Sequence, residues 1–247
     1  MPNLILINIL NNKKKLNITN PKETAIKYLI CLIIIFIRLD IQISLMNKLK
    51  VNLDKFVEDY KLQLTETVLK LDHFKLQKII KLFELTIKNK KKIFTCGNGG
   101  SASVSNHFLC DFNKGIKFFS NKKIKPKVIS LSNSIENITA ISNDESFDNI
   151  FENQLENYVE SGDLLCVFSC SGNSKNILKV LRYAKKRKCK TVAFTGFHKK
   201  KIKNADIHLD LDIKNYGISE DVFQSIMHIT SQFLKIKYTK NKLKAIL

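Results

Sequence analysis

Acidic residues are scarce in this 247-residue chain, which carries 22 Asp and Glu against 42 Lys and Arg and a formal net charge of +20. An excess of this size is typical of nucleic-acid-binding proteins when it gathers in one patch. Here the basic residues are spread along the chain and accompany abundant Ile and Asn, which favours a coding bias over a selected basic surface. We therefore expect no nucleic-acid partner, and only a general attraction for phosphorylated anions.

The N-terminal part lacks an apolar run long enough to cross a membrane. Residues 28–37 are wholly apolar, but a spanning helix needs about 20 such residues, and the small-residue cleavage site of a signal peptide is missing. After Met46 the pattern changes to an ordinary amphipathic helix. We expect residues 1–45 to be an N-terminal extension, more plausibly an over-extended reading frame than a membrane-surface anchor. Residues 46–247 would form the domain, with no stable membrane insertion.

Two further absences narrow the chemistry. The six cysteines show no paired metal-ligand spacing and no disulfide framework, so buried free thiols in a reducing cytoplasm explain them. The phosphate-loop pattern of Gly, four residues and Gly-Lys-Ser or Gly-Lys-Thr is also missing, which argues against a nucleoside triphosphate. The apolar fraction of 44% is nevertheless sufficient for a complete core.

Short apolar strands alternate with amphipathic helices in the rest of the chain. The expected strands are residues 92–95, 127–131, 164–168, 191–194 and 207–211. The expected helices include two within 49–88, then 101–112, 176–186 and about 219–236. This order predicts an α/β fold, a three-layer α-β-α sandwich with a five-stranded parallel sheet, flavodoxin-like, with N-terminal helices and a long C-terminal helix. Ligands of such sheets bind at the carboxyl ends of the strands.

The loop after the third expected strand is rich in hydroxyl groups, with the sequence Ser169-Cys170-Ser171-Gly172-Asn173-Ser174. Hydroxyls and the backbone N–H groups of a helix N-terminus bind phosphate, and glycine lets the backbone approach closely. A single serine here would indicate a helix cap. Three serines in six residues, without a lysine, favour a phosphate site over capping.

Other motifs follow the first strand and the later helices: Cys96-Gly97-Asn98-Gly99-Gly100-Ser101, His107-Phe108, Ser142-Asn143-Asp144 and Tyr216-Gly217. With the serine loop, they make residues 93–240 resemble the sugar isomerase (SIS) domain family, in particular its phosphoheptose isomerase branch. In that family the glycine loop and the Asn-Asp pair contact the sugar, and the serine loop holds the phosphate. The resemblance implies a substrate-binding set of Asn98, Gly99, Gly100, Ser101, Asn143, Asp144, Ser169, Cys170, Ser171 and Ser174. Cys170 stands where the family usually has Thr, so one hydroxyl donor is lost.

His107 and Asp111 are four residues apart on an expected helix and therefore share one face. This spacing suits a metal pair or an acid–base pair, although a local ion pair has the same spacing. The family has His followed four residues later by Glu, which is both a zinc ligand and the proposed base. Asp111 is one methylene shorter, so its reach is reduced by about 1.5 Å.

His228 on the last helix matches the family's catalytic and metal-binding histidine if Glu220 replaces the family's glutamine ligand. Eight helical residues rise by about 12 Å, so Glu220 would have to precede the helix and bend back, or the site would combine two chains. Gln224 is the geometric alternative, and a core histidine is the plain alternative for His228. The resemblance implies a Zn²⁺ site of His107, Asp111, Glu220 and His228, with Asp111 and His228 catalytic.

The resemblance also implies an activity: aldose–ketose isomerisation of a phosphorylated sugar, sedoheptulose 7-phosphate to D-glycero-D-manno-heptose 7-phosphate, for lipopolysaccharide or capsule precursors. It implies a cytoplasmic homotetramer with active sites between subunits. Two alternatives stay open, an isomerase for another ketose phosphate and a non-catalytic SIS regulator that binds a sugar phosphate or a protein such as the replication initiator. The presence of His107, Asp111 and His228 favours the enzyme, and the lack of a helix-turn-helix module weakens a transcriptional role.

Overall fold

The computed structural model describes residues 29–30, 32–41, 52–197 and 202–239. By its contacts the chain divides into two compact units, Met1–Val57 and Glu58–Leu247. In the first unit residues 29–30 and 32–41 are helical. None of the helices in the described ranges is long and apolar enough to cross a membrane. The expectation that residues 1–45 lie outside the working domain stays a prediction.

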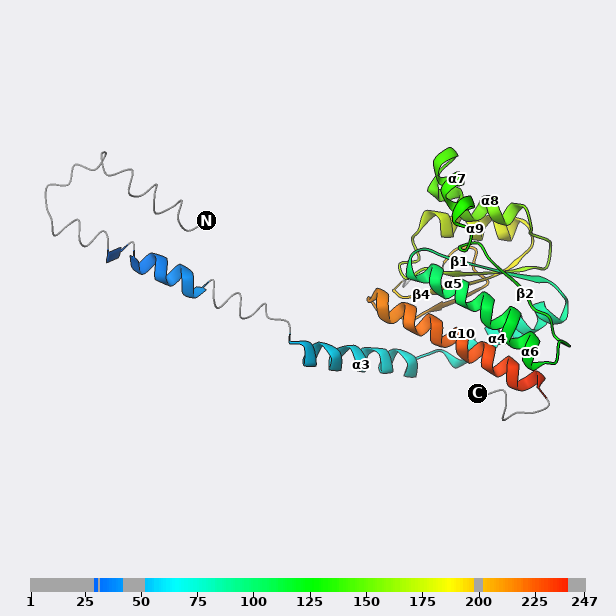
Figure 1. Ribbon diagram of the computed structural model, residues 1–247, viewed down its shortest axis with the longest axis horizontal. Helices are drawn as coiled ribbons and strands as arrows, with labels where there is room; N and C mark the ends of the chain where they lie inside the picture. Colours follow the sequence, from blue (N-terminus) through cyan, green and yellow to red (C-terminus); the bar gives the residue numbers. More distant parts are fainter. Residues whose placement is uncertain (1–28, 31, 42–51, 198–201, 240–247) are drawn as a thin grey trace. The chain divides into compact units, whose positions relative to one another are not determined.

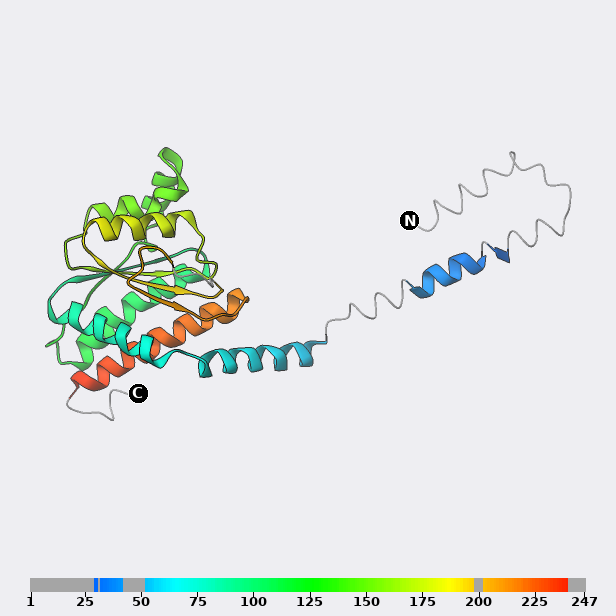
Figure 2. The same ribbon diagram turned by 180° about the vertical axis from the view of Figure 1, so that it is seen from behind.

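A five-stranded parallel sheet forms the middle layer of the second unit (Figures 1 and 2). In the spatial order β2-β1-β3-β4-β5, its strands are β2 (Lys127–Ser130), β1 (Lys92–Gly97), β3 (Leu164–Phe168), β4 (Lys190–Thr195) and β5 (Ile207–Asp210). Every neighbouring pair is parallel. This is the order of flavodoxin-like sheets, so the predicted fold is confirmed, and the strand limits agree with those expected to within two residues.

Helices cover both faces of the sheet and bury two hydrophobic cores (Figure 1). On one face lie α4 (His73–Lys88), α5 (Gly100–Cys110) and α10 (Tyr216–Tyr238), and on the other α7 (Ile135–Asp144), α8 (Ile150–Glu156) and α9 (Lys175–Lys186). Strand β3 supplies both cores, because Cys166 and Phe168 belong to the first and Leu165 and Val167 to the second. The order also contains the helix α3 (Leu53–Leu69) before α4 and the short 3₁₀-helix η3 (Phe147–Asn149) before α8.

The helix after the glycine loop differs from its expected form. The sequence predicts one regular helix over 101–112, but α5 passes into a π-helix, η2 (Asp111–Ile116), and a short α6 (Lys117–Phe119). Phe108, Phe112 and Ile116 are all fully buried, and the wider turn keeps these residues, four apart, on the side of the core. π-Helical turns occur often at functional sites. This one begins at Asp111.

Candidate active site

A pocket of about 300 Å³ opens where β1 and β3 reach the carboxyl edge of the sheet. Because these two strands are neighbours, the glycine loop and the serine loop lie next to each other. Eight of the predicted substrate-binding residues line the pocket together: Asn98, Gly99, Gly100, Ser101, Ser169, Cys170, Ser171 and Ser174. Phe168, Tyr216 and Glu220 complete the lining. Such a pocket is large enough for a small phosphorylated molecule.

The backbone of both loops takes conformations that favour glycine. Gly99, at the start of α5, has φ +55°, and Gly172, inside the serine loop, has φ +65°. Ser174 occupies the N-cap position of α9, but its side chain makes no capping hydrogen bond. This serine therefore does not cap the helix with its side chain, and the residue lines the pocket at the positive end of α9.

A residue that the sequence analysis missed holds the two loops together. Asn176, which is 1% exposed, donates to the Oδ1 of Asn98 at 3.0 Å and accepts from the Nδ2 of Asn98 at 3.1 Å. The Oδ1 of Asn176 also accepts from the backbone N–H of Ile177. Asn98 is thereby fixed relative to the first turn of α9. Nothing in the spacing of these residues along the chain points to this pairing.

Glu220 lies in this pocket and not beside His228. Its Oε1 accepts a hydrogen bond from the Oγ of Ser101 at 3.2 Å and is 3.9 Å from the Sγ of Cys170. Because α10 begins at Tyr216, Glu220 is inside the helix and does not bend back from a preceding loop. Its carboxylate also fills the space beside Gly100, where an added Cβ would come within 2.0 Å of Oε2. Burial raises the pKa of the Cys170 thiol, which therefore stays protonated near neutral pH.

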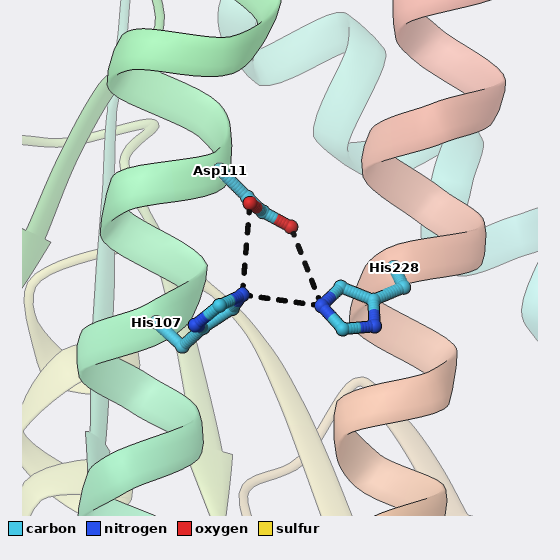
Figure 3. A group of neighbouring side chains, drawn as sticks. All are labelled: His107, Asp111 and His228. Carbon is cyan, nitrogen blue, oxygen red and sulfur yellow. Dashed lines mark hydrogen bonds and ion pairs between the residues drawn. The ribbon is translucent and has the colours of Figure 1, made fainter. Parts of the chain in front are cut away.

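A second group of polar side chains gathers where α5 and α10 lie side by side (Figure 3). The Nε2 atoms of His107 and His228 are 3.1 Å apart. Asp111 lies between the two histidines, with Oδ1 3.7 Å from the Nε2 of His107 and Oδ2 3.8 Å from the Nε2 of His228. His107 and His228 are about half exposed, at 50% and 42% of their side-chain surface, which excludes the core-histidine alternative for His228.

The spacing of these three donors suits a divalent metal ion. Two ligands at about 2.05 Å from a tetrahedral zinc ion are about 3.4 Å apart, and the observed separations of 3.1, 3.7 and 3.8 Å lie on both sides of this value. Imidazole and carboxylate are ordinary zinc ligands. Gln224 adds a fourth polar group, since its Nε2 is 3.0 Å from the Nε2 of His228. A half-turn of its amide would direct the oxygen toward the same point.

The Asn-Asp pair is the part of the predicted site that remains apart from both groups. Asn143 and Asp144 end helix α7 and are exposed to solvent. The amide of Asn143 donates to the carboxylate of Asp144 at 2.8 Å, and neither residue lines the pocket between the loops. Their predicted contact with the sugar stays a prediction.

The sequence of this chain matches a known domain family. The model of the SIS domain matches residues 56–196, which is more than half of the chain. The chain belongs to the SIS domain family. It is 33% identical to a probable phosphoheptose isomerase of Thermoplasma acidophilum, across 154 residues that make up 62% of this chain and 82% of that protein.

Two further proteins with the name phosphoheptose isomerase are similar to this chain. The chain is 39% identical to the phosphoheptose isomerase of Aliarcobacter butzleri over 121 residues, 49% of this chain and 62% of that protein. The solved structure of phosphoheptose isomerase from Neisseria gonorrhoeae superposes with a TM-score of 0.66 at 24% identity, covering 74% of this chain and 98% of that one. This likeness confirms the SIS fold deduced from the sequence.

Proposed function

We propose that this protein is an aldose–ketose isomerase for a phosphorylated sugar, with sedoheptulose 7-phosphate as substrate and D-glycero-D-manno-heptose 7-phosphate as product. The observation that carries the proposal is that one chain holds both the hydroxyl-rich pocket between the two loops and the group of His107, Asp111 and His228, here called the His–Asp–His group. The relatives named phosphoheptose isomerase support the choice of sugar. The product would enter the synthesis of lipopolysaccharide or capsule precursors.

The two groups of residues lie at a distance that a heptose phosphate can span. Ser101 and His107 are six residues apart on α5, and Glu220 and His228 are eight apart on α10. These separations correspond to a rise of about 9 and 12 Å. An extended seven-carbon sugar phosphate measures about 10 Å from phosphorus to C1, by ordinary bond lengths. Its phosphate would bind the serine loop while C1 and C2 lie near Asp111.

The reaction moves a proton from C1 to C2 of the ketose through an enediol, with a second proton moving between the oxygens of these carbons. Asp111 would accept the proton from C1 and return it at C2. His228 would donate to the C2 oxygen and accept from the C1 oxygen through the ring nitrogen that does not hold the metal ion. The two side chains suit one step because they face one point, with Asp111 Oδ2 3.8 Å from His228 Nε2.

His107, Asp111 and His228 would hold a zinc ion, with Gln224 as the fourth protein donor from the same chain. When bound, the ion would polarise the carbonyl oxygen of the sugar and stabilise the negative charge that develops there. The predicted ligand Glu220 lies in the other pocket of its own chain, so it would join the ion only from a second copy. Zinc-binding stoichiometry of Glu220→Gln and Gln224→Ala variants separates the two possibilities.

We also propose a cytoplasmic homotetramer in which a second copy covers the site. This proposal is supported by the exposure of His107 and His228, because about half of each side chain is open to contact with a neighbouring subunit. An apolar hollow of about 740 Å³ between α4 and α10, with exposed Ile229 and Phe233 on its wall, offers a surface for such contact. The cysteines of the described residues are all free, which suits a reducing compartment.

The proposal is tested with a panel of ketose phosphates and the matching sugars without phosphate. The metal-loaded protein should convert sedoheptulose 7-phosphate to the aldose and leave unphosphorylated sedoheptulose unchanged. Faster conversion of another ketose phosphate would reassign the substrate. Tight binding of a sugar phosphate without conversion of any would favour the non-catalytic regulator.

A further inference from the structure

One buried hydroxyl group donates a hydrogen bond to the carboxylate of the His–Asp–His group. Ser231 lies on α10 three residues after His228 and is 0% exposed. Its Oγ donates to Oδ2 of Asp111 at 3.2 Å and is also 3.2 Å from the backbone oxygen of His228. A serine has one hydroxyl proton for these two acceptors. The carboxylate is the stronger of them because it is charged.

The contact with Asp111 distinguishes Ser231 from its neighbours on the helix. Serine and threonine inside helices commonly donate to a carbonyl three or four residues earlier. Thr230, also 0% exposed, does so at 2.7 Å to Ile226, and Ser225 does so at 2.9 Å to Asp221. In the described part of the chain neither of them donates to a carboxylate, whereas Ser231 joins α10 to Asp111, the first residue of η2.

This bond fixes the direction of a short side chain. Asp111 offers Oδ1 to His107 and Oδ2 to His228 at nearly equal distances, as Figure 3 shows. A quarter-turn about the last bond of the side chain would move both oxygens away from the histidines. Since Ser231 donates to Oδ2, it opposes that rotation. The carboxylate is thus oriented from its buried side, and its other side faces the two imidazoles.

We propose that Ser231 is a positioning residue, which orients the Asp111 carboxylate for metal binding and for proton transfer. The inference rests on the proposed function, because it takes Asp111 as a metal ligand and base. Hydrogen-bond partners of metal-binding carboxylates commonly contribute 10- to 100-fold to metal affinity or activity. Removal of the Ser231 hydroxyl should have an effect of this size, although the residue would touch neither the metal nor the sugar.

The experiment compares Ser231→Ala with Thr230→Val in the full-length protein. Both changes delete one fully buried hydroxyl from the same helix. Zinc and cobalt(II) affinities are measured on the metal-stripped protein by calorimetry, and kcat and KM are measured with excess metal. Ser231→Ala should bind metal about 10- to 100-fold more weakly and lower kcat with little change in KM. Thr230→Val should match the wild type in metal affinity.

A double-mutant cycle with Asp111→Ala shows whether Ser231 acts through Asp111. In that background Ser231→Ala should change metal affinity by less than twofold. Equal losses in both backgrounds, or wild-type affinity in Ser231→Ala, would overturn the inference. A wild-type protein that binds no metal would overturn both the inference and the proposed metal site. Metal binding without isomerase activity would overturn the proposed function alone, and the affinities would still decide the role of Ser231.

Discussion

Replacement of Asp111 by Asn tests the proposed base most sharply. Asn has the same size, and its oxygen can still accept the hydrogen bond that Ser231 donates at 3.2 Å. The fold should therefore survive. The amide cannot accept a proton from C1, and its NH₂ group would take the place of Oδ1, 3.7 Å from the Nε2 of His107. Loss of a general base lowers turnover by about 10² to 10⁴, which is about 2.7 to 5.5 kcal/mol of activation free energy.

The assay measures kcat on sedoheptulose 7-phosphate with zinc in excess, so that weaker metal binding is not mistaken for lost proton transfer. His228→Ala should cause a loss of similar size, and the double mutant should lose far less than the product of the two, because both residues serve one step. Asp111→Glu supplies the matched control. Its carboxylate reaches about 1.5 Å further, and it should keep measurable activity because a base is present. Wild-type turnover in Asp111→Asn would show that the base lies elsewhere.

Three further predictions concern the phosphate pocket, acid stability and the N-terminal segment. The double mutant Ser171→Ala, Ser174→Ala should bind sugar phosphate more weakly by about 1.5–3 kcal/mol for each charge-assisted hydrogen bond lost. The control Ser103→Ala removes a hydroxyl exposed on α5 and should leave the affinity unchanged. A double mutant that binds as tightly as the wild type would place the phosphate elsewhere. Hydrogen bonds from Lys237 and Tyr238 lower the pKa of Glu84 from 4.5 to about 2. The stability that Glu84 contributes is therefore present above pH 4.5 and lost as the pH falls toward 2. In urea unfolding between these pH values, the free energy of unfolding of Glu84→Gln should fall less than that of the wild type. An equal fall in the two proteins would contradict this. A protein that begins at Met46 should be folded and active. If that variant is inactive, residues 1–45 are needed for the function of the protein.

Much of the fold could be predicted from local patterns. Apolar strands that alternate with amphipathic helices are sufficient to indicate a parallel sheet, and the observed strands lie where the sequence analysis expected them. The glycine and serine loops could be assigned to one pocket because both follow strands whose carboxyl ends meet at one edge. His107 and Asp111 could be placed on one helix face by their spacing alone.

The remaining features depend on contacts between helices, which periodicity does not specify. A pattern of apolar residues says that α10 has a buried side, but not that Ser231 on that side meets Asp111. The bond between Asn98 and Asn176 is of the same kind. The π-helix at Asp111 was missed because its cause is the packing of Phe108, Phe112 and Ile116 against the core. Glu220 was matched to the metal by family spacing, and its place in α10 puts it beside Ser101.

The central claim is that this chain isomerises a ketose phosphate by proton transfer at a metal-binding His–Asp–His group. Proton NMR of sedoheptulose 7-phosphate in D₂O, with zinc-loaded wild-type protein, tests it most directly. We expect an aldose product that carries deuterium at C2, because the proton on Asp111 exchanges with solvent before it is returned. A sugar phosphate that remains unconverted and free of deuterium, although the protein binds it, would contradict the account.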